Sequence, residues 1–145
     1  MSQHLIVLKP NYLNAVLTGD KTIECRLARR PIPPYHAVQI GDILWLKVSL
    51  GPVLARAVVS DVFYHDSLTP AKIKDLRRRF NSGILGTDDY WTDRMDCRYA
   101  TLICMEAVTP IEPLCPNFKL AGPWLVLKGK KESVFSSICL KSSNT

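Results

Sequence analysis

The sequence predicts one α+β domain, in which a closed β-barrel of short strands is accompanied by two or three helices. Short runs of β-branched and alternating residues recur along the chain, and turn residues separate them, a pattern typical of small barrels. Two other segments space their apolar residues as helices do. The length of 145 residues and the hydrophobic content of 47% suit a single domain with a substantial core.

The first predicted elements are a strand and a short helix. Residues 4–9 contain an apolar run of β-type side chains that ends at Pro10. Asn11 is a favourable N-cap for the helix that follows, and Gly19 stands where a helix commonly ends in a left-handed residue. The chain is therefore expected to reverse its direction at Gly19 and Asp20.

The second predicted strand, residues 22–27, has a core face and a charged face. Successive side chains of a strand point to opposite sides, so residues of the same parity share a face. The core face carries Ile23, Cys25 and Leu27. The charged face carries Thr22, Glu24 and Arg26.

The middle of the chain reads as a loop followed by further strands. Residues 29–36 hold three prolines and are expected to form an extended loop rather than a regular element. The Gly-Asp pair at residues 41–42 is suited to a tight turn before a strand over residues 43–48. The β pattern resumes over residues 53–59, and residues 62–64 are a candidate extension of that strand.

A second helix is predicted to start after Thr69. Threonine is a good N-cap, and Pro70 then occupies the first helical position, where its missing N–H costs nothing. Apolar residues follow at i, i+3 and i+7, which gives the helix one buried stripe. The stripe consists of Ile73, Leu76 and Phe80.

The last third is predicted to contain a loop, two strands and a tail. Residues 81–96 are expected to form an irregular loop with at most one helical turn, and residues 99–108 and 124–127 are strand-like. Beyond that point the composition shifts to Lys, Ser and Asn, so residues 129–145 are expected to be a mobile tail. The predicted organisation is one domain over residues 1–128 followed by this tail.

The composition also narrows the functional classes. Nineteen Lys and Arg against thirteen Asp and Glu give a net charge of +6, which favours a polyanionic partner. The N-terminus does not resemble a secretory signal, and no apolar stretch approaches the roughly 20 residues of a membrane span. Five cysteines without a C-x-x-C pair argue against a disulfide framework and a zinc site. These features indicate a cytoplasmic protein, or a nuclear one if the source is eukaryotic.

The densest polar group lies at residues 19–26. Lys21, Thr22, Glu24 and Arg26 follow a turn within one short stretch. A carboxylate flanked by two cations is held in its ionised form, and the arginine fork is then oriented to bind a phosphate or a base edge. The alternative is an ordinary solvent-facing strand with a Glu–Arg pair, which would contribute little.

The string G-D-K-T-I-E-C-R at residues 19–26 resembles the G-x-K-x-x-E-x-R signature of the ASCH (activating signal cointegrator homology) domain. The opening strand that ends at Lys9 and Pro10, the turn at residues 41–42 and the late strand near Trp124 agree with this resemblance. It covers roughly residues 5–127. The resemblance implies a PUA-like mixed β-barrel with two or three flanking helices and a cleft, in a family widely taken to bind RNA.

On this resemblance a basic cleft would hold RNA or a nucleotide. Lysine and arginine supply phosphate contacts, and aromatic planes stack unpaired bases. For Trp45 a place in the core is the more common explanation, and for the two aromatic residues at positions 90 and 91 lid packing is an equal alternative. The candidate cleft residues are Lys21, Thr22, Glu24, Arg26, Trp45, Lys47, Tyr90 and Trp91.

The second predicted helix carries five cations within eight residues: Lys72, Lys74, Arg77, Arg78 and Arg79. A solvated helix face is the usual explanation of such a cluster. The density exceeds what solubility requires, so we expect these side chains, the three arginines above all, to contact a nucleic-acid backbone.

The alternative function is a small hydrolase, either an amidohydrolase acting on an acylated nucleoside or a ribonuclease. Some small ASCH proteins are similar to acetylcytidine amidohydrolases that use a Lys, a Thr and a Glu. Here Lys21 matches the lysine, but Glu24 occupies the hydroxyl position, and Asp88 or Asp89 can replace the missing acid only if their loop folds over the cleft. Lys21 and Glu24 would then transfer protons.

Other site chemistries have weak support in the sequence. His4, His36 and His65 have no metal-ligand spacing, so no metal site is expected, and no cofactor is implied. Cys25 faces the predicted core, where a thiol is inert. A protein-interaction module remains a third class, in which the basic helix meets an acidic partner.

Overall fold

The protein forms a curled sheet flanked by three helices, and the computed structural model describes residues 1–116, 120, 122–127 and 135–136. The helices are α1 (Pro10–Thr18), α2 (Pro70–Ile84) and α3 (Asp88–Thr92). The strands are β1 (Gln3–Leu8), β2 (Ile23–Ala28), β3 (Ile43–Val48), β4 (Val53–His65), β5 (Tyr99–Pro116), β6 (Trp124–Leu127) and β7 (Phe135–Ser136). No helix in the described part of the chain is long and apolar enough to cross a membrane.

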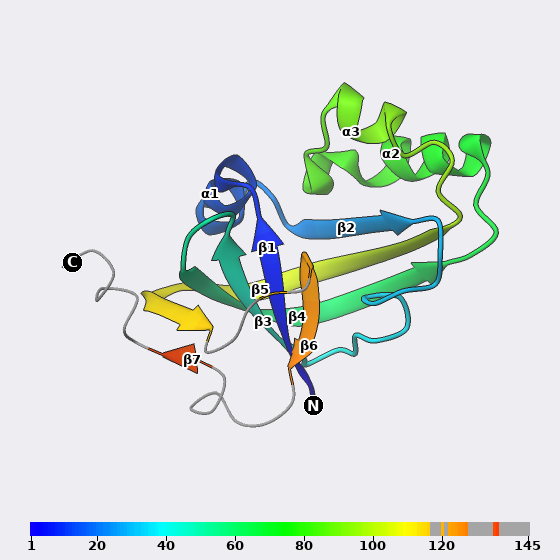
Figure 1. The fold of residues 1–145 in the computed structure, drawn as a ribbon. Helices are drawn as coiled ribbons and strands as arrows, with labels where there is room; N and C mark the ends of the chain where they lie inside the picture. Colours follow the sequence, from blue (N-terminus) through cyan, green and yellow to red (C-terminus); the bar gives the residue numbers. More distant parts are fainter. Residues whose placement is uncertain (117–119, 121, 128–134, 137–145) are drawn as a thin grey trace.

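The strand order is β2-β5-β4-β3-β1-β6, and β7 pairs with the end of β5. Among the strands that the structure describes, β1 and β3 run parallel and the other pairs are antiparallel, so the sheet is mixed. Figure 1 shows that the sheet curls into a half-barrel, with α1 near β1 and with α2 and α3 together beside β2. This architecture confirms the predicted α+β class, with a mixed, barrel-like sheet and two or three helices, but the described strands do not close into the closed barrel that the strand pattern suggested.

The long β4–β5 ribbon explains the curvature. The two strands are 13 and 18 residues long, longer than the sequence pattern indicated for either. Their pairing shifts register at several points along the ribbon, and such irregularities bend and twist a strand pair. The ribbon can therefore take part in the barrel at one end and carry α2 and α3 at the other (Figure 1).

The helix ends follow local stereochemistry. Gly19 ends α1 in the left-handed conformation with φ of 86°, as predicted, whereas the N-cap is Lys9 and not Asn11. Pro10 takes the first helical position because it has no N–H to leave unpaired, and this moves the start of the helix back by two residues. Thr69 caps α2 as expected, since its hydroxyl accepts a hydrogen bond from the Lys72 N–H.

The segment after α2 is more regular than the predicted loop. The α2 helix continues to Ile84 and ends at Leu85, and α3 then starts after Thr87, whose hydroxyl accepts from the Tyr90 N–H. The predicted mobile tail, residues 129–145, lies outside the described residues except for β7.

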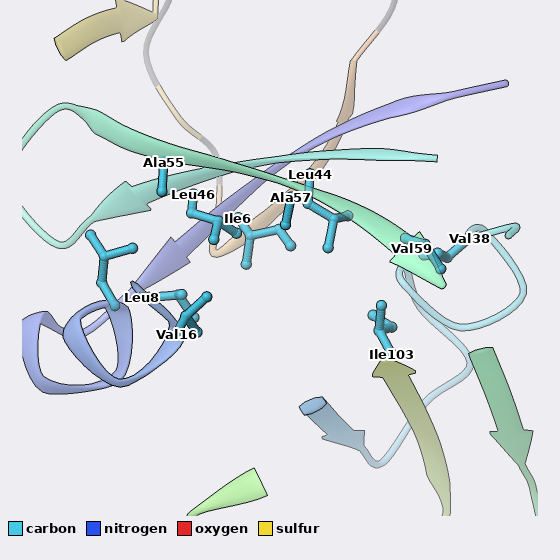
Figure 2. Close-up of a cluster of buried hydrophobic side chains, with 11 residues drawn as sticks. Ile6, Leu8, Val16, Val38, Leu44, Leu46, Ala55, Ala57, Val59 and Ile103 are labelled. Atoms are coloured by element: carbon cyan, nitrogen blue, oxygen red, sulfur yellow. The ribbon is translucent and has the colours of Figure 1, made fainter. Parts of the chain in front are cut away.

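The main core lies inside the curl of the sheet. Figure 2 shows side chains from β1, β3, β4, α1 and β5 that face the inside of this curl and form one buried cluster. A second cluster, which contains Ile73, Leu76 and Trp91, fastens α2 and α3 to β2 and β5. Both helices of the α2–α3 pair are therefore held rigidly against the strand that bears the ASCH-like signature.

The cysteine pattern argued against disulfide bonds, but Cys115 is disulfide-bonded. Cys25, Cys97 and Cys104 are free thiols.

A buried polar group anchors the start of β3. Asp42 is 1% exposed, and its carboxylate accepts hydrogen bonds from the N–H groups of Ser2 and Gln39 and pairs with the fully buried His4 at 2.8 Å. Burial raises the pKa of this carboxyl, but the hydrogen bonds from His4, Ser2 and Gln39 outweigh it and hold the pKa below its ordinary value of 3.8.

We predict that Asp42→Asn lowers the free energy of unfolding by about 1–3 kcal/mol at pH 7, because an amide cannot accept all of these bonds. Asp42 binds a proton less readily when folded than when unfolded. Its contribution is therefore fully present above the ordinary pKa and is lost as the pH falls through the folded value.

Urea titrations between pH 7 and pH 3 test this prediction. The stability difference between wild type and Asp42→Asn should narrow as the pH falls below 4. A difference that stays constant over this range would contradict the prediction.

Candidate functional site

A cleft of about 710 Å³ opens between the two ends of the sheet, a size within the range of ligand pockets. In the order of the described strands, β2 and β6 are the end strands. Arg26 of β2 and Trp124 of β6 both line the cleft, together with residues of β1, α1, the proline loop and the α3 region. The cleft thus lies where the half-barrel remains open.

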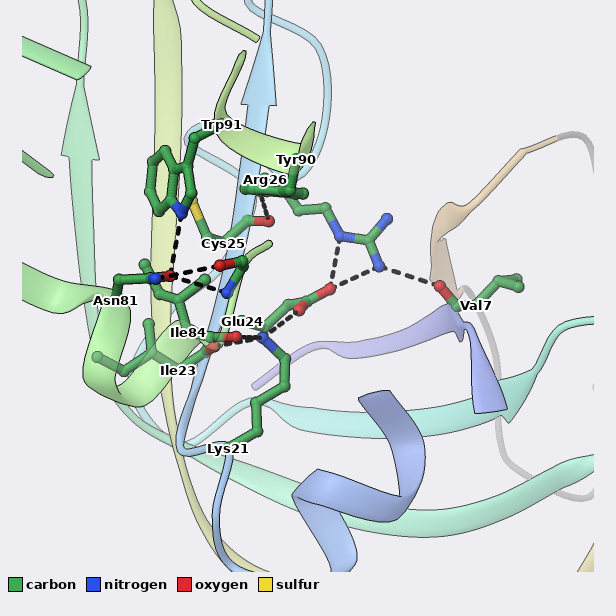
Figure 3. Close-up of polar contacts among 11 residues, drawn as sticks. Val7, Lys21, Ile23, Glu24, Cys25, Arg26, Asn81, Ile84, Tyr90 and Trp91 are labelled. Carbon is green, nitrogen blue, oxygen red and sulfur yellow. Dashed lines mark hydrogen bonds and ion pairs between the residues drawn. The ribbon is translucent and has the colours of Figure 1, made fainter. Parts of the chain in front are cut away.

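Lys21 is the most deeply buried of the three charged residues Lys21, Glu24 and Arg26, and it is only 3% exposed. Its ammonium donates to the carbonyl oxygens of Ile23 (2.8 Å) and Ile84 (2.6 Å) and lies 3.4 Å from Oε1 of Glu24 (Figure 3). These three acceptors match its three N–H groups. Lys21 therefore ties the β2 strand to the end of α2 and keeps no free donor.

Glu24 sits between Lys21 and Arg26 and is 6% exposed. Its Oε2 lies 2.7 Å from both Nε and Nη2 of Arg26. A buried carboxylate needs such partners, because an unpaired buried charge costs several kcal/mol. The predicted charged face of β2 is therefore not a solvent-facing strand, and the alternative of an ordinary surface pair is wrong.

Arg26 links the two ends of the sheet. Its Nη2 donates to the carbonyl oxygen of Val7 on β1 at 3.1 Å, and its guanidinium lies 5.4 Å from the ring of Trp124. Figure 3 shows the guanidinium extended from β2 toward Val7, with Nη1 outside the dashed contacts. Within the described residues Nη1 has no hydrogen-bond partner, and Arg26 is half-buried, so these N–H groups are free to bind a ligand.

Cations and aromatic rings are paired throughout the cleft lining. Besides Arg26 and Trp124, the ammonium of Lys21 lies 5.2 Å from the ring of Tyr12, and the guanidinium of Arg94 lies 4.0 Å from the ring of Tyr90. Such pairs restrain flexible side chains and present flat surfaces to the cleft.

The thiol and phenol at the back of the cleft are not reactive groups. Burial is the main cause that raises the pKa of the Cys25 thiol to about 11, and it also raises the pKa of Tyr90 well above 10. The Tyr90 hydroxyl donates to the Cys25 carbonyl oxygen at 2.8 Å. Both side chains therefore remain neutral at physiological pH, in agreement with the prediction of an inert Cys25.

The lining carries mixed charge. The four cations are Lys9, Lys21, Arg26 and Arg94, and the three acidic residues are Glu24, Asp89 and Asp93. The α3 region does fold over the cleft and brings Asp89 to it, while Asp88 pairs with Arg77 instead. The expectation of a basic cleft is therefore not confirmed.

Several predicted residues lie away from the cleft. Trp45 is 4% exposed in a core cluster with Leu5, and its indole N–H donates to Gln3. Trp91 is fully buried beneath α3, and its indole N–H donates to Asn81 (Figure 3). For Trp45 this is the core position that the sequence analysis gave as the more common explanation, and for Trp91 it agrees with the alternative of packing within the lid.

Thr22 and Lys47 also do not line the cleft. Thr22 is exposed next to α2, where its N–H donates to the Gly83 carbonyl oxygen. The Lys47 ammonium donates to the Val48 carbonyl oxygen, and partial burial lowers its pKa. Thr22 directly precedes β2 in the signature string, which is why sequence proximity grouped it with the site. Lys47 lies on β3, which β4 and β5 separate from β2, so the two strands are not the neighbours that a shared cleft would need.

The arginines of α2 form ion pairs on the surface. Arg77 pairs with Asp88, and Arg78 and Arg79 both pair with Asp75. Exposed pairs of this kind contribute little to stability. None of the three arginines lines the cleft, so any contact they make with a ligand lies outside it.

Tyr12, Arg94 and Trp124 line the cleft but are not among the residues that the sequence predicts for it. Tyr12 and Trp124 carry only the signal of an aromatic residue beside a turn or strand end, which many core residues share, and Arg94 carries no distinguishing signal. Their common position depends on how the sheet curls. Among the described residues no group of three His, Cys, Asp or Glu is arranged to hold a metal ion.

We predict that the two ends of the Lys21–Glu24 pair respond differently to substitution. Glu24→Leu leaves Lys21 and Arg26 without an anion and should lower the free energy of unfolding by about 3 kcal/mol or more. Lys21→Met leaves Glu24 paired with Arg26 and should cost less than half of that.

Urea unfolding at pH 7 provides the measurement. Asp20→Asn is the control, because Asp20 is an exposed acid in the same turn, and it should change stability little. Equal losses for Glu24→Leu and Lys21→Met would show that the carboxylate is not the centre of the network.

The sequence matches no protein-family model and no curated protein. Solved structures do match. The ASCH protein from Zymomonas mobilis superposes with a TM-score of 0.68 at 21% identity, over 97% of this chain and 94% of that one. Two point variants of the same protein each give a TM-score of 0.69 at 20% identity, with coverage of 95% or more of either chain. The likeness extends over nearly the whole of both chains, and the chain therefore has the fold of this ASCH protein.

Proposed function

We propose that the cleft binds RNA or a nucleotide, with Arg26 as its central contact. The observation that carries this proposal is the fixed guanidinium of Arg26, which Glu24 and Val7 hold in place while Nη1 has no partner among the described residues, in a pocket of ligand size. A pre-oriented guanidinium can donate to a phosphate oxygen or to a base acceptor. The ASCH fold is compatible with such a partner, and the net charge of +6 favours a polyanion.

The charge arrangement suggests how an RNA segment would lie. Asp89 and Asp93 are exposed in the α3 part of the lining and would repel a phosphate on that side of the cleft, whereas an uncharged base would meet no such repulsion. Lys9, at the mouth between β1 and α1, is exposed and suited to a phosphate. On this proposal a base enters the cleft and the backbone remains at its rim.

The bonding of Lys21 argues against the hydrolase alternative. A catalytic lysine must exchange a proton with its substrate, but the ammonium of Lys21 already faces three protein acceptors and is almost fully buried. Wild-type protein incubated with acylated nucleosides should show no turnover. Turnover that Lys21→Ala abolishes would establish the hydrolase in place of the binding module.

We predict that Arg26→Lys weakens binding of a labelled single-stranded RNA octamer by about tenfold or more, because hydrogen bonds to charged groups contribute roughly 1.5–3 kcal/mol. Lysine keeps the charge but loses the planar fork. Fluorescence anisotropy titration measures the affinity.

Arg30→Lys is the matched control, since Arg30 is exposed, close in sequence and outside the cleft lining. If both variants bind as wild type does, Arg26 is not the RNA contact.

We also predict that the basic face of α2 extends the RNA path. Replacing Arg77, Arg78 and Arg79 together by Ser should lower the affinity and reduce the slope of log K against log salt by about two, as loss of three single-strand phosphate contacts implies. Because the three arginines already pair with Asp75 and Asp88, the change of about two in the slope is an upper limit.

The same octamer titrated at several salt concentrations gives the slope. An unchanged affinity and an unchanged slope in the triple variant would confine RNA binding to the cleft.

A further inference from the structure

Trp124 differs from the other two tryptophans of the chain in its position. Trp45 and Trp91 are buried and lie outside the cleft, whereas Trp124 is half-buried and forms part of the cleft wall at the start of β6. It stands diagonally across from His4 in the β1–β6 pair, where Ile6 is its direct partner. One edge of its indole therefore faces the core and another part faces the cleft.

A buried hydrogen-bond chain fixes the core-facing edge of this indole. The Trp124 Nε1–H donates to Nδ1 of His4 at 3.2 Å. Since an indole nitrogen can only donate, Nδ1 of His4 must accept, so the His4 proton is on Nε2 and is donated to Oδ2 of Asp42 at 2.8 Å. Asp42 is in turn held by two backbone N–H groups.

The chain of bonds restrains the plane of the indole. Turning the Trp124 ring would leave Nδ1 of the fully buried His4 without a partner, which is a costly arrangement. His4 itself cannot turn without giving up its bond to Asp42. The fold thus connects a rigid, buried anion to the orientation of one aromatic ring in the cleft.

The cations beside the three cleft rings differ. Arg94 covers Tyr90 at 4.0 Å, which is contact distance, and Tyr12 faces the ammonium of Lys21 at 5.2 Å, whose N–H groups all have protein acceptors. Arg26 lies 5.4 Å from Trp124, and its Nη1 has no partner among the described residues. Trp124 therefore combines an orientation fixed by buried hydrogen bonds with an adjacent donor.

We propose that Trp124 is the surface on which an unpaired RNA base stacks in the cleft, and that His4 and Asp42 are positioning residues that hold its plane. This inference rests on the proposed RNA-binding function. Stacking on Trp124 would place the edge of the base next to Arg26, so that one side chain supplies the plane and the other the hydrogen bond.

Tryptophan fluorescence tests the proposal directly, since Trp124 is the one tryptophan at the cleft. An unlabelled single-stranded RNA octamer should quench the emission of the wild-type protein, and an abasic octamer of the same length should not. Trp124→Phe should abolish the quenching. Trp124→Leu should weaken binding, measured by calorimetry, by about tenfold or more, as expected for loss of one base–aromatic stack.

The positioning role has its own readout. His4→Leu removes the acceptor for the indole and should reduce both the quenching and the affinity, at a temperature where circular dichroism shows the variant folded. Trp45→Phe is the control, because it removes a core indole that bonds to Gln3 away from the cleft and should leave quenching and affinity unchanged.

The outcomes separate the two proposals. Absence of RNA binding by calorimetry in the wild type overturns the proposed function and this inference together. Binding that persists while Trp124→Phe keeps full quenching and Trp124→Leu keeps full affinity overturns the stacking role alone. Wild-type quenching and affinity in His4→Leu overturn the positioning role.

Discussion

The buried carboxylate of Glu24 is the constraint on which the site depends. It lies between Lys21 and Arg26, and neither cation could remain at its present depth without a counter-ion. Lys21 uses its remaining hydrogens to join β2 to the end of α2, and Arg26 uses one of its own to reach β1. Through Lys21 and Arg26, the carboxylate of Glu24 therefore links β2 to the end of α2 and to β1.

In this arrangement Lys21 has a structural role, whereas Arg26 has both a structural and a proposed binding role. Lys21 is saturated by protein acceptors, so its charge serves the fold. Arg26 has five N–H groups, and the protein uses only some of them, which leaves donors directed at the cleft. The geometry of the guanidinium permits this double use, and the ammonium group does not.

The half-barrel accounts for the position of the cleft. A fully closed barrel would pair β2 with β6, but here the two described end strands are connected by side chains of Arg26 and Trp124 instead. The gap between them is wide enough for a ligand and is covered from the side by the α3 region. Behind it, the bonds from Trp124 through His4 to Asp42 extend the same rigid framework into the core.

Local sequence determined the elements whose signals are short-range. The Thr69-Pro70 start of α2, the left-handed Gly19 and the strand over residues 43–48 follow from backbone stereochemistry and side-chain alternation within a few residues. The pattern at residues 19–26 also identified the ASCH fold, because closely spaced charges leave a recognisable string. What only the tertiary structure decided is which distant side chains meet: Trp124 reaches the cleft while Trp45 enters the core. Both are aromatic residues in strands, and their difference arises from the curl of the sheet, which depends on contacts between segments up to 120 residues apart.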